Sequence, residues 1–301
     1  MRRAGEYSIA AQVWALRQHG EVGPRTFRAL MAHFGNLAAI LEAELEELTE
    51  IDGLGEKKSQ KIFESFGSLQ KADQFIQSLE KRKIGYSTLF DEDFPRLFME
   101  LNDPPPIIFY QGRLPDQDEK RVAIVGSHKA TNEGIRNGVT LASELAAKSV
   151  SIVSGLARGI DASAHLGALK VDGRTYGVLG SGFDHIHPEE NRGLAQEMLA
   201  RGGLISEYPP EATYATGRVM ARNRLTAGLS QTVIIGEVFN DSTGSLDTAT
   251  FCRDVGKLMF VLIDGCDEPG HDNGGGDKVL ALGAIPITLS AGIDIILKSL
   301  V

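Results

Sequence analysis

The chain has 301 residues, which is long enough for two domains of about 150 residues each. Hydrophobic residues make up 42% of it and charged residues 24%, the composition of a globular protein, and no apolar run approaches the roughly 20 residues of a membrane helix. The 31 basic and 40 acidic residues give a net charge of −9. This balance argues against a protein that coats nucleic acid with a positive surface, so a nucleic-acid site has to be a local basic patch.

The N-terminus lacks the apolar stretch of a secretion signal behind Arg2 and Arg3, so we expect a cytoplasmic protein without a membrane partner. Its two cysteines, Cys252 and Cys266, are too few for a disulfide framework and do not form a C-x-x-C pair.

Residues 1–82 are predicted to form a small all-helical domain, because Leu30, Phe34, Leu37 and Leu41 recur at helical spacing. Within it, residues 51–62 have the layout of a helix-hairpin-helix. In such a hairpin a glycine turn presents backbone N–H groups to a phosphate and neighbouring lysines add charge.

The candidate phosphate contacts of this hairpin are Gly53, Gly55, Lys57 and Lys58, and residues 22–26 resemble a weaker second copy of it. A hairpin of this kind also serves as a purely structural scaffold, and the residues alone leave both interpretations open.

Residues 83–120 are predicted to be a linker that ends in one strand at residues 107–110. The three prolines at 104–106 exclude a helix interior, and a charged stretch, 116–121, follows the strand.

Residues 121–301 alternate between apolar strands and helices. Strands are expected at 122–125, 150–153, 175–179, 232–235 and 258–262, with helices at 131–148 and 160–170. Nearly continuous apolar strands between helices are typical of a parallel sheet covered on both faces. The fold class is therefore α/β with a doubly wound, mostly parallel sheet, and its ligand is expected at the carboxyl ends of the strands.

Small, hydroxylated and cationic residues gather around those strand ends. Glycines allow a close approach to the backbone, helix N-termini attract anions, and hydroxyl and guanidinium groups complete a phosphate site. The candidate nucleic-acid-binding residues are Ser127, His128, Lys129, Ser154, Gly155, Arg158, Arg218, Arg222, Asn223, Arg224, Thr243, Gly244 and Ser245.

The sequence offers little catalytic chemistry. A G-x-G-x-x-G fingerprint, a phosphate loop ending in G-K-[ST] and a G-x-S-x-G elbow are all absent. In the segment Asp184–His187, His185 and His187 are two residues apart and would share a face of an extended chain, but no third metal ligand is near them. We therefore expect a binding groove without catalytic residues, metal or cofactor.

Five ordered motifs make the chain resemble the DprA family, also called Smf. They are residues 153–165 (VSGLARGIDASAH), 180–192 (GSGFDHIHPEENR), 206–209 (SEYP), 222–230 (RNRLTAGLS) and 243–249 (TGSLDTA). The resemblance covers nearly the whole chain. It implies an extended Rossmann-like domain behind a small domain similar to the sterile alpha motif (SAM-like).

Members of this family bind single-stranded DNA without sequence preference, usually as homodimers. They load the RecA recombinase onto the strand during natural transformation, an activity that is not enzymatic. The resemblance implies the same partners here, with Arg222 and Arg224 as the main phosphate contacts.

The chain departs from the family pattern at three places. His128 stands where an arginine is usual, and Val219-Met220 replaces a Phe-Pro pair whose ring can stack on a base. The chain also ends at Val301 without the winged-helix domain of many members, so we expect none.

Two alternatives remain. One is a nucleotide-binding sensor or phosphoribohydrolase-like protein in which Asp161 or Glu237 acts on a ribose, although the P-G-G-x-G-T-x-x-E loop expected of such an enzyme is missing. The other is a scaffold that holds RecA or another protein without DNA.

Overall fold

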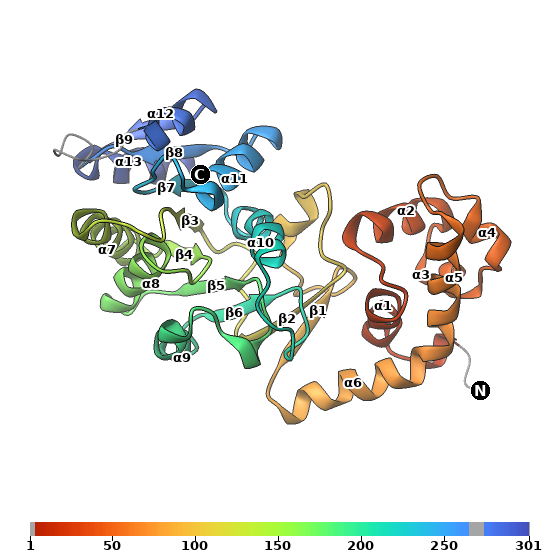
Figure 1. Ribbon diagram of the computed structural model, residues 1–301. Coiled ribbons are helices and arrows are strands. Elements are labelled where there is room, and N and C mark those ends of the chain that lie inside the picture. The colour runs from red at the N-terminus through yellow and green to blue at the C-terminus, as the bar shows by residue number, and fades with distance from the viewer. Residues whose placement is uncertain (1–3, 265–273, 301) are drawn as a thin grey trace. The chain divides into compact units, whose positions relative to one another are not determined.

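A computed structural model describes residues 4–264 and 274–300, so Cys266 lies outside the described residues (Figure 1). The described chain divides into two compact units. The first contains the residues up to Phe94 together with Met99–Phe109, and the second contains Pro95–Phe98 and the chain from Tyr110 onward. The chain passes between the units within residues 94–110, inside the segment that the sequence assigns to the linker.

The first unit is mainly helical. Its α-helices are α1 (Ile9–Gln18), α2 (Pro24–Phe34), α3 (Leu37–Glu42), α4 (Leu45–Thr49), α5 (Glu56–Ser65) and α6 (Leu69–Lys81). Its 3-10 turns are η1 (Ala4–Glu6) and η2 (Phe66–Ser68), and it includes β1 (Gly85–Thr88) and the first half of β2 (Ile107–Gly112).

The core of this unit is built around Trp14. The Trp14 ring stacks on Phe75 with centroids 4.7 Å apart and meets the edge of Phe109 at 5.2 Å. Ser8, the residue before α1, caps this helix by accepting a hydrogen bond from the Ala11 N–H, which satisfies one of the free donors of the first helical turn.

The second unit is an α/β domain. In chain order its elements are η3 (Arg96–Glu100, shared with the first unit), the end of β2, β3 (Arg121–Val125), α7 (Asn132–Ala147), β4 (Ser151–Ser154), α8 (Ile160–Lys170), β5 (Thr175–Leu179), η4 (Phe183–His185), η5 (Glu189–Asn191), α9 (Arg192–Met198), β6 (Gly203–Ser206), α10 (Thr216–Gly228), β7 (Thr232–Ile235), α11 (Thr243–Asp254), β8 (Met259–Leu262), α12 (Gly274–Ala281), β9 (Ile285–Ile287) and α13 (Leu289–Ser299).

The strands from β3 to β9 form a parallel sheet in the order β6-β5-β4-β3-β7-β8-β9. In its middle, Ala123 pairs with Val153 on one side and Val233 on the other. The chain adds β4, β5 and β6 on one side of β3, then crosses over to add β7, β8 and β9 on the opposite side. This reversal beside β3 is the topological switch point of a doubly wound sheet.

Helices cover both faces of this sheet (Figure 1). On one face α7, α8 and α13 pack on Val122, Ile124, Ile152 and Ile234 in a fully apolar core. On the other face lie α10, α11 and α12. The predicted fold class is confirmed, since the strands are buried and parallel as their apolar runs indicate.

Three strands were not expected from the sequence. Residues 83–120 were predicted to hold one strand, but the structure also has β1 there, a segment too polar to stand out. The strand β6 has only two strongly apolar residues, Leu204 and Ile205, and β9 is three residues long. Strands of this kind depend on pairing and packing with their neighbours in the sheet, which a local apolar pattern does not reveal.

Candidate functional site

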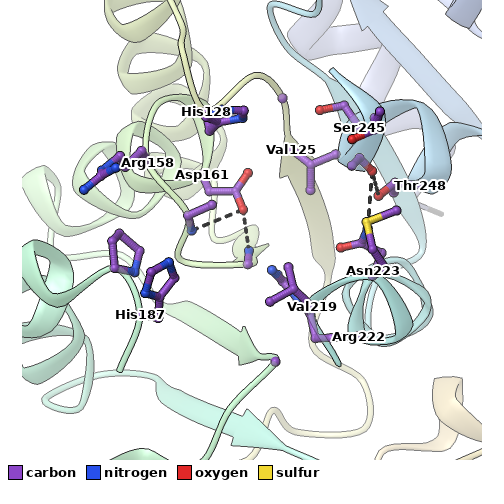
Figure 2. Close-up of a pocket in the computed structure, with 18 of the residues that line it drawn as sticks. Val125, His128, Arg158, Asp161, His187, Val219, Arg222, Asn223, Ser245 and Thr248 are labelled. Atoms are coloured by element: carbon purple, nitrogen blue, oxygen red, sulfur yellow. Dashed lines mark hydrogen bonds between the residues drawn. The ribbon is translucent and has the colours of Figure 1, made fainter. Parts of the chain in front are cut away.

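A cavity of about 290 Å³ opens at the carboxyl edge of the parallel sheet in the second unit (Figure 2). Its walls come from the loops after β3, β4, β5 and β6, from α10 and from the start of α11. The cavity therefore lies at the switch point beside β3, where doubly wound sheets bind their ligands.

The loop after β3 supplies Ser127 and His128 to the cavity wall. Ser127 is buried, its N–H donates to the backbone carbonyl of Glu237 at 2.7 Å, and its hydroxyl accepts from the Lys129 N–H at 3.1 Å. His128 is exposed and faces the cavity (Figure 2). The loop therefore holds a hydroxyl inside the cavity wall and an imidazole at its surface.

The loop after β4 wraps around the carboxylate of Asp161. This carboxylate accepts hydrogen bonds from the N–H groups of Gly155, at 3.1 Å, and Ala157, at 3.4 Å (Figure 2). Burial raises the pKa of Asp161, and the positive charge of Arg222 opposes this rise. Because Asp161 already occupies these amides, they are not open to an external phosphate.

Arg158 lies at the mouth of the cavity and is held by an acidic neighbour. Its Nε and Nη2 atoms both donate to the carboxylate of Glu190 at 2.6 Å. This hydrogen bonding raises the pKa of Arg158 and lowers the pKa of Glu190. Both side chains are exposed, so the pair is open to exchange with a phosphate.

Arg222 places a buried positive charge in the cavity wall. The residue is only 4% exposed, its Nη1 atom lies 3.4 Å from the Thr226 hydroxyl, and its Nε atom has no hydrogen-bond partner among the described residues. The guanidinium packs directly on Gly155, where an added Cβ would lie 1.5 Å from Nη1. Glycine is therefore required at position 155 so that the guanidinium can occupy this place.

The start of α11 forms the opposite wall. Thr243, Gly244 and Ser245 line the cavity, and the Asn223 side chain ties α10 to them by donating to the Gly244 carbonyl at 3.3 Å and to Asp247 at 3.1 Å. The partial positive charge of a helix N-terminus favours an anion at this wall.

The cavity brings together many of the residues that the sequence predicts for one site. Those that line it are Ser127, His128, Gly155, Arg158, Arg222, Asn223, Thr243, Gly244 and Ser245.

Arg224 differs from the expectation because it does not line the cavity. On helix α10, residues two apart point in different directions, so Arg222 enters the cavity and Arg224 turns away. The Arg224 guanidinium donates to Glu207 at 2.8 Å, and the two side chains are 13% and 3% exposed. Its position indicates a structural ion pair rather than a main phosphate contact.

Lys129, Ser154 and Arg218 also lie outside the cavity lining. The Lys129 ammonium lies 3.4 Å from Asp241, and the buried Ser154 hydroxyl donates to a backbone carbonyl of β3. Arg218, in the first turn of α10, donates to the Thr213 carbonyl in the preceding loop, and its guanidinium lies 5.3 Å from the centre of the Tyr208 ring.

The sequence analysis missed two rings that line the cavity, His187 and Tyr214. They belong to the loops after β5 and β6, and their centroids are 3.9 Å apart. The sequence around His187 indicates only a metal ligand, and nothing in it pairs His187 with Tyr214, which is 27 positions away.

The hairpin of the first unit consists of α4, a turn and α5. Gly53 has a φ of +81° in this turn, and Gly55 precedes the first residue of α5. Lys57 is exposed, whereas the Lys58 ammonium donates to the backbone carbonyl of Glu21 at 2.5 Å. One of the two candidate lysines is thus engaged within the unit.

The described residues contain neither a membrane-spanning helix nor a metal-binding cluster. In residues 4–264 and 274–300 no helix is long and apolar enough to cross a membrane. Over the same ranges no three His, Cys, Asp or Glu side chains gather where they could hold a metal ion, and Asp184, His185 and His187 do not form such a group.

Comparison with known proteins assigns the chain to a family. The family model described as DNA recombination-mediator protein A matches residues 85–296, which is most of the chain. The chain belongs to this family. The expected resemblance is confirmed, and a model of the SAM-like helix-hairpin-helix tandem matches residues 20–67, which confirms the hairpin.

Relatives of this recombination-mediator family match over much of the chain. Protein Smf of Synechocystis is 35% identical over 283 residues, covering 88% of this chain and 71% of the relative. DNA processing protein DprA of Bacillus subtilis is 32% identical, covering 71% of each chain.

Two solved structures are also similar. DprA of Streptococcus pneumoniae matches with a TM-score of 0.82 at 26% identity, over 97% of this chain and 98% of its own. DprA of Helicobacter pylori, whose structure concerns its binding of single-stranded DNA, matches with a TM-score of 0.62 at 31% identity, over 72% of this chain and 97% of its own.

Proposed function

We propose that this protein binds single-stranded DNA without sequence preference, in the cavity at the carboxyl edge of the parallel sheet. The observation that carries the proposal is the cavity itself, in which a buried guanidinium, a helix N-terminus and an exposed arginine meet in a strongly acidic chain. The single-strand binding named for the H. pylori relative supports the same ligand. Contacts with phosphates and sugars carry no sequence information, which accounts for the absence of sequence preference.

The residues have separate parts in this proposal. Arg158 and His128 receive backbone phosphates at the mouth of the cavity, since both are exposed and line it. Arg222 supplies a fixed positive charge from within the wall, and its partnerless Nε is a donor for a phosphate that reaches inside. Thr243, Gly244 and Ser245 offer hydroxyl and N–H groups at the start of α11, with Ser127 and Asn223 beside them.

Other residues contribute to binding from beside the cavity and from the first unit. Lys129 attracts the strand beside the cavity, and Gly155 gives Arg222 its place in the wall. The hairpin adds a second, weaker contact through the exposed Lys57, with Gly53 and Gly55 shaping the turn and Lys58 nearby. Arg224, Ser154 and Arg218 support the site from outside the cavity.

Membership of the recombination-mediator family supports a biological role for this binding. The protein loads RecA recombinase onto the bound strand in DNA processing for recombination and natural transformation, acting in the cytoplasm as a homodimer. It acts by binding rather than by catalysis. Assembly of RecA on an oligonucleotide covered with single-strand-binding protein tests the loading step, and light scattering of the purified protein tests the dimer.

The alternative of a nucleotide-processing enzyme finds less support. Glu237 is engaged in capping α7, because its carboxylate accepts from the N–H and the hydroxyl of Thr131 at 2.5 and 2.6 Å. Asp161 accepts from backbone amides and is buried. Glu237 does not line the cavity, and the carboxylate of Asp161, which does, is already engaged by the amides of Gly155 and Ala157.

The direct test is fluorescence anisotropy of a labelled oligo-dT with the wild-type chain and with Thr243→Glu. Thr243 is exposed at the first position of α11, where a carboxylate suits the helix but repels a phosphate. We expect Thr243→Glu to weaken binding roughly tenfold.

The matched control is Ser290→Glu, which adds the same charge to the first turn of α13 at an exposed position outside the cavity. It should bind within about twofold of wild type. If the wild-type chain does not bind the oligonucleotide at micromolar protein, or if a mononucleotide competes as well as the strand does, the proposal is wrong.

A further inference from the structure

The wall around α10 offers no ring on which a base could stack. Val219 stands where the family pattern has an aromatic residue, and its backbone packs so closely on Gly180 that an added Cβ there would lie 2.7 Å from the Val219 Cα. Val219 and Met220 therefore close this wall with aliphatic side chains. A strand bound at the cavity needs another surface for its bases, because base stacking contributes much of the affinity for single strands.

A different pair of rings lines the same cavity. His187 and Tyr214 have centroids 3.9 Å apart and an interplanar angle of 38°, and Tyr214 is 45% exposed. Since Tyr214 leans on His187 through one face, its remaining exposure leaves part of the ring to solvent. We call these two residues the Tyr214–His187 platform.

Hydrogen bonds hold the two loops of the platform together. The Gly182 N–H donates to the Ala212 carbonyl at 2.8 Å, and the Asp184 N–H donates to the Pro210 carbonyl at 3.0 Å. Gly182 approaches the Pro209 carbonyl so closely that an added Cβ would lie 2.1 Å from its oxygen. The platform is therefore fixed before a ligand arrives, which lowers the entropy cost of binding.

The platform also lies beside a phosphate-binding group. His187 and Arg158 both line the cavity and are on the same side of it in Figure 2, where the Arg158 guanidinium is held by the carboxylate of Glu190. A ring face next to an exposed guanidinium is the arrangement that receives a base and its adjoining phosphate.

We infer that the Tyr214–His187 platform is a nucleobase subsite, on which a base of the bound strand stacks against Tyr214 while His187 supports the ring from behind. The inference rests on the proposed single-strand binding and adds to it the surface that receives the base. Because every base has a π face, this contact is tolerant of sequence.

The test compares wild type, Tyr214→Ala and Tyr214→Phe with two labelled strands, oligo-dT and an abasic strand of equal length. Tyr214→Ala should bind oligo-dT about 5- to 100-fold more weakly than wild type, because it loses the stacking contact. Tyr214→Phe keeps the ring and should bind like wild type. On the abasic strand the Tyr214→Ala variant should lose little, because no base is present to stack.

The matched control is Tyr86→Ala, which removes an exposed tyrosine of the first unit that does not line the cavity, and thermal unfolding of each variant checks its fold. If wild type and Tyr214→Ala bind oligo-dT equally well, the Tyr214–His187 platform is not a nucleobase subsite, while the proposed function stands. If Tyr214→Ala loses affinity for both strands by the same factor, the ring contributes to binding without contacting a base, and the inference is also overturned. If wild type does not bind oligo-dT, both proposals fail.

Discussion

The side chain of His165 is held in one protonation state by its neighbours. Its Nδ1 atom lies 2.6 Å from the Thr175 hydroxyl, and this hydroxyl donates to the Ile152 carbonyl at 3.0 Å. The Thr175 oxygen must therefore accept a hydrogen bond from the Nδ1–H. The Nε2 atom is buried without a hydrogen-bond partner among the described residues, which favours the neutral imidazole with a bare Nε2. Burial, together with the positive charge of Arg222, lowers the pKa of His165 to about 3.

This low pKa predicts a loss of stability in acid. Below pH 6.5 the unfolded chain protonates His165 and the folded chain does not until about pH 3, so the free energy of unfolding falls as the pH falls through this range. In the wild-type chain His165 should contribute a slope of about 1.4 kcal/mol per pH unit to the free energy of unfolding between pH 6 and 4. The His165→Gln variant should lack this contribution. Urea unfolding at several pH values measures it.

The control for this measurement is His185→Gln, which removes an exposed histidine from the same unit. A His165→Gln variant whose pH dependence matches that of wild type would show that the folded protein protonates His165 at its ordinary pKa.

Among the elements, the hairpin of the first unit shows which of its two glycines the backbone requires. Gly53 has a φ of +81°, a region that L-residues with a side chain occupy at a cost, whereas Gly55 has a φ of −78°. Both positions are open, with no atom within 4 Å of an added Cβ. The two glycines therefore differ in backbone conformation and not in space.

This difference predicts different results for two alanine substitutions. Gly53→Ala should lower the free energy of unfolding by about 1–2 kcal/mol, because alanine is strained at positive φ. Gly55→Ala, the matched control, should change it by less than about 1 kcal/mol, because the reduced freedom of the unfolded chain offsets the poorer N-cap that alanine gives α5. Urea unfolding of both variants provides the measurement, and equal losses would contradict the assignment of the turn.

The elements also show how far the sequence predicts the fold. The apolar runs at 122–125, 175–179 and 232–235 are strands within one residue of the expected bounds, since each is apolar over nearly its whole length. The strand at 203–206 was missed because two apolar residues give no period. The helix α10 was not expected around Arg222, because its exposed and buried positions have no clear amphipathic pattern.

The same reasoning explains which part of the site was predictable. Parallel strands end at one edge, so Ser127, Gly155 and Thr243 could be assigned to one site from the sequence. The burial of Arg222 and the pairing of Arg158 with Glu190 depend on packing between distant segments. No local pattern carries that information.

The whole molecule is acidic, with a net charge of −9, and two of the cations around the cavity are paired with carboxylates. Arg158 is bound to Glu190 and Lys129 lies beside Asp241, and all four side chains are exposed. A phosphate therefore has to displace a carboxylate before either cation can bind it. This competition limits the number of phosphates that the site neutralises, and with it the dependence of binding on salt.

The double variant Glu190→Gln and Asp241→Asn releases both cations and changes the net charge from −9 to −7. We expect it to bind oligo-dT several-fold more tightly at low salt. The plot of log affinity against log salt should become steeper by about 0.7 for each added phosphate contact. Anisotropy titrations between about 50 and 200 mM salt measure both quantities.

The control is Asp172→Asn with Asp254→Asn, which removes the same charge from two exposed ion pairs away from the cavity, those with Arg201 and Arg253. If pairing at the cavity limits binding, only the first double variant gains affinity and slope. Equal gains in both would mean that the overall negative charge of the molecule, acting at long range, sets the affinity for the strand.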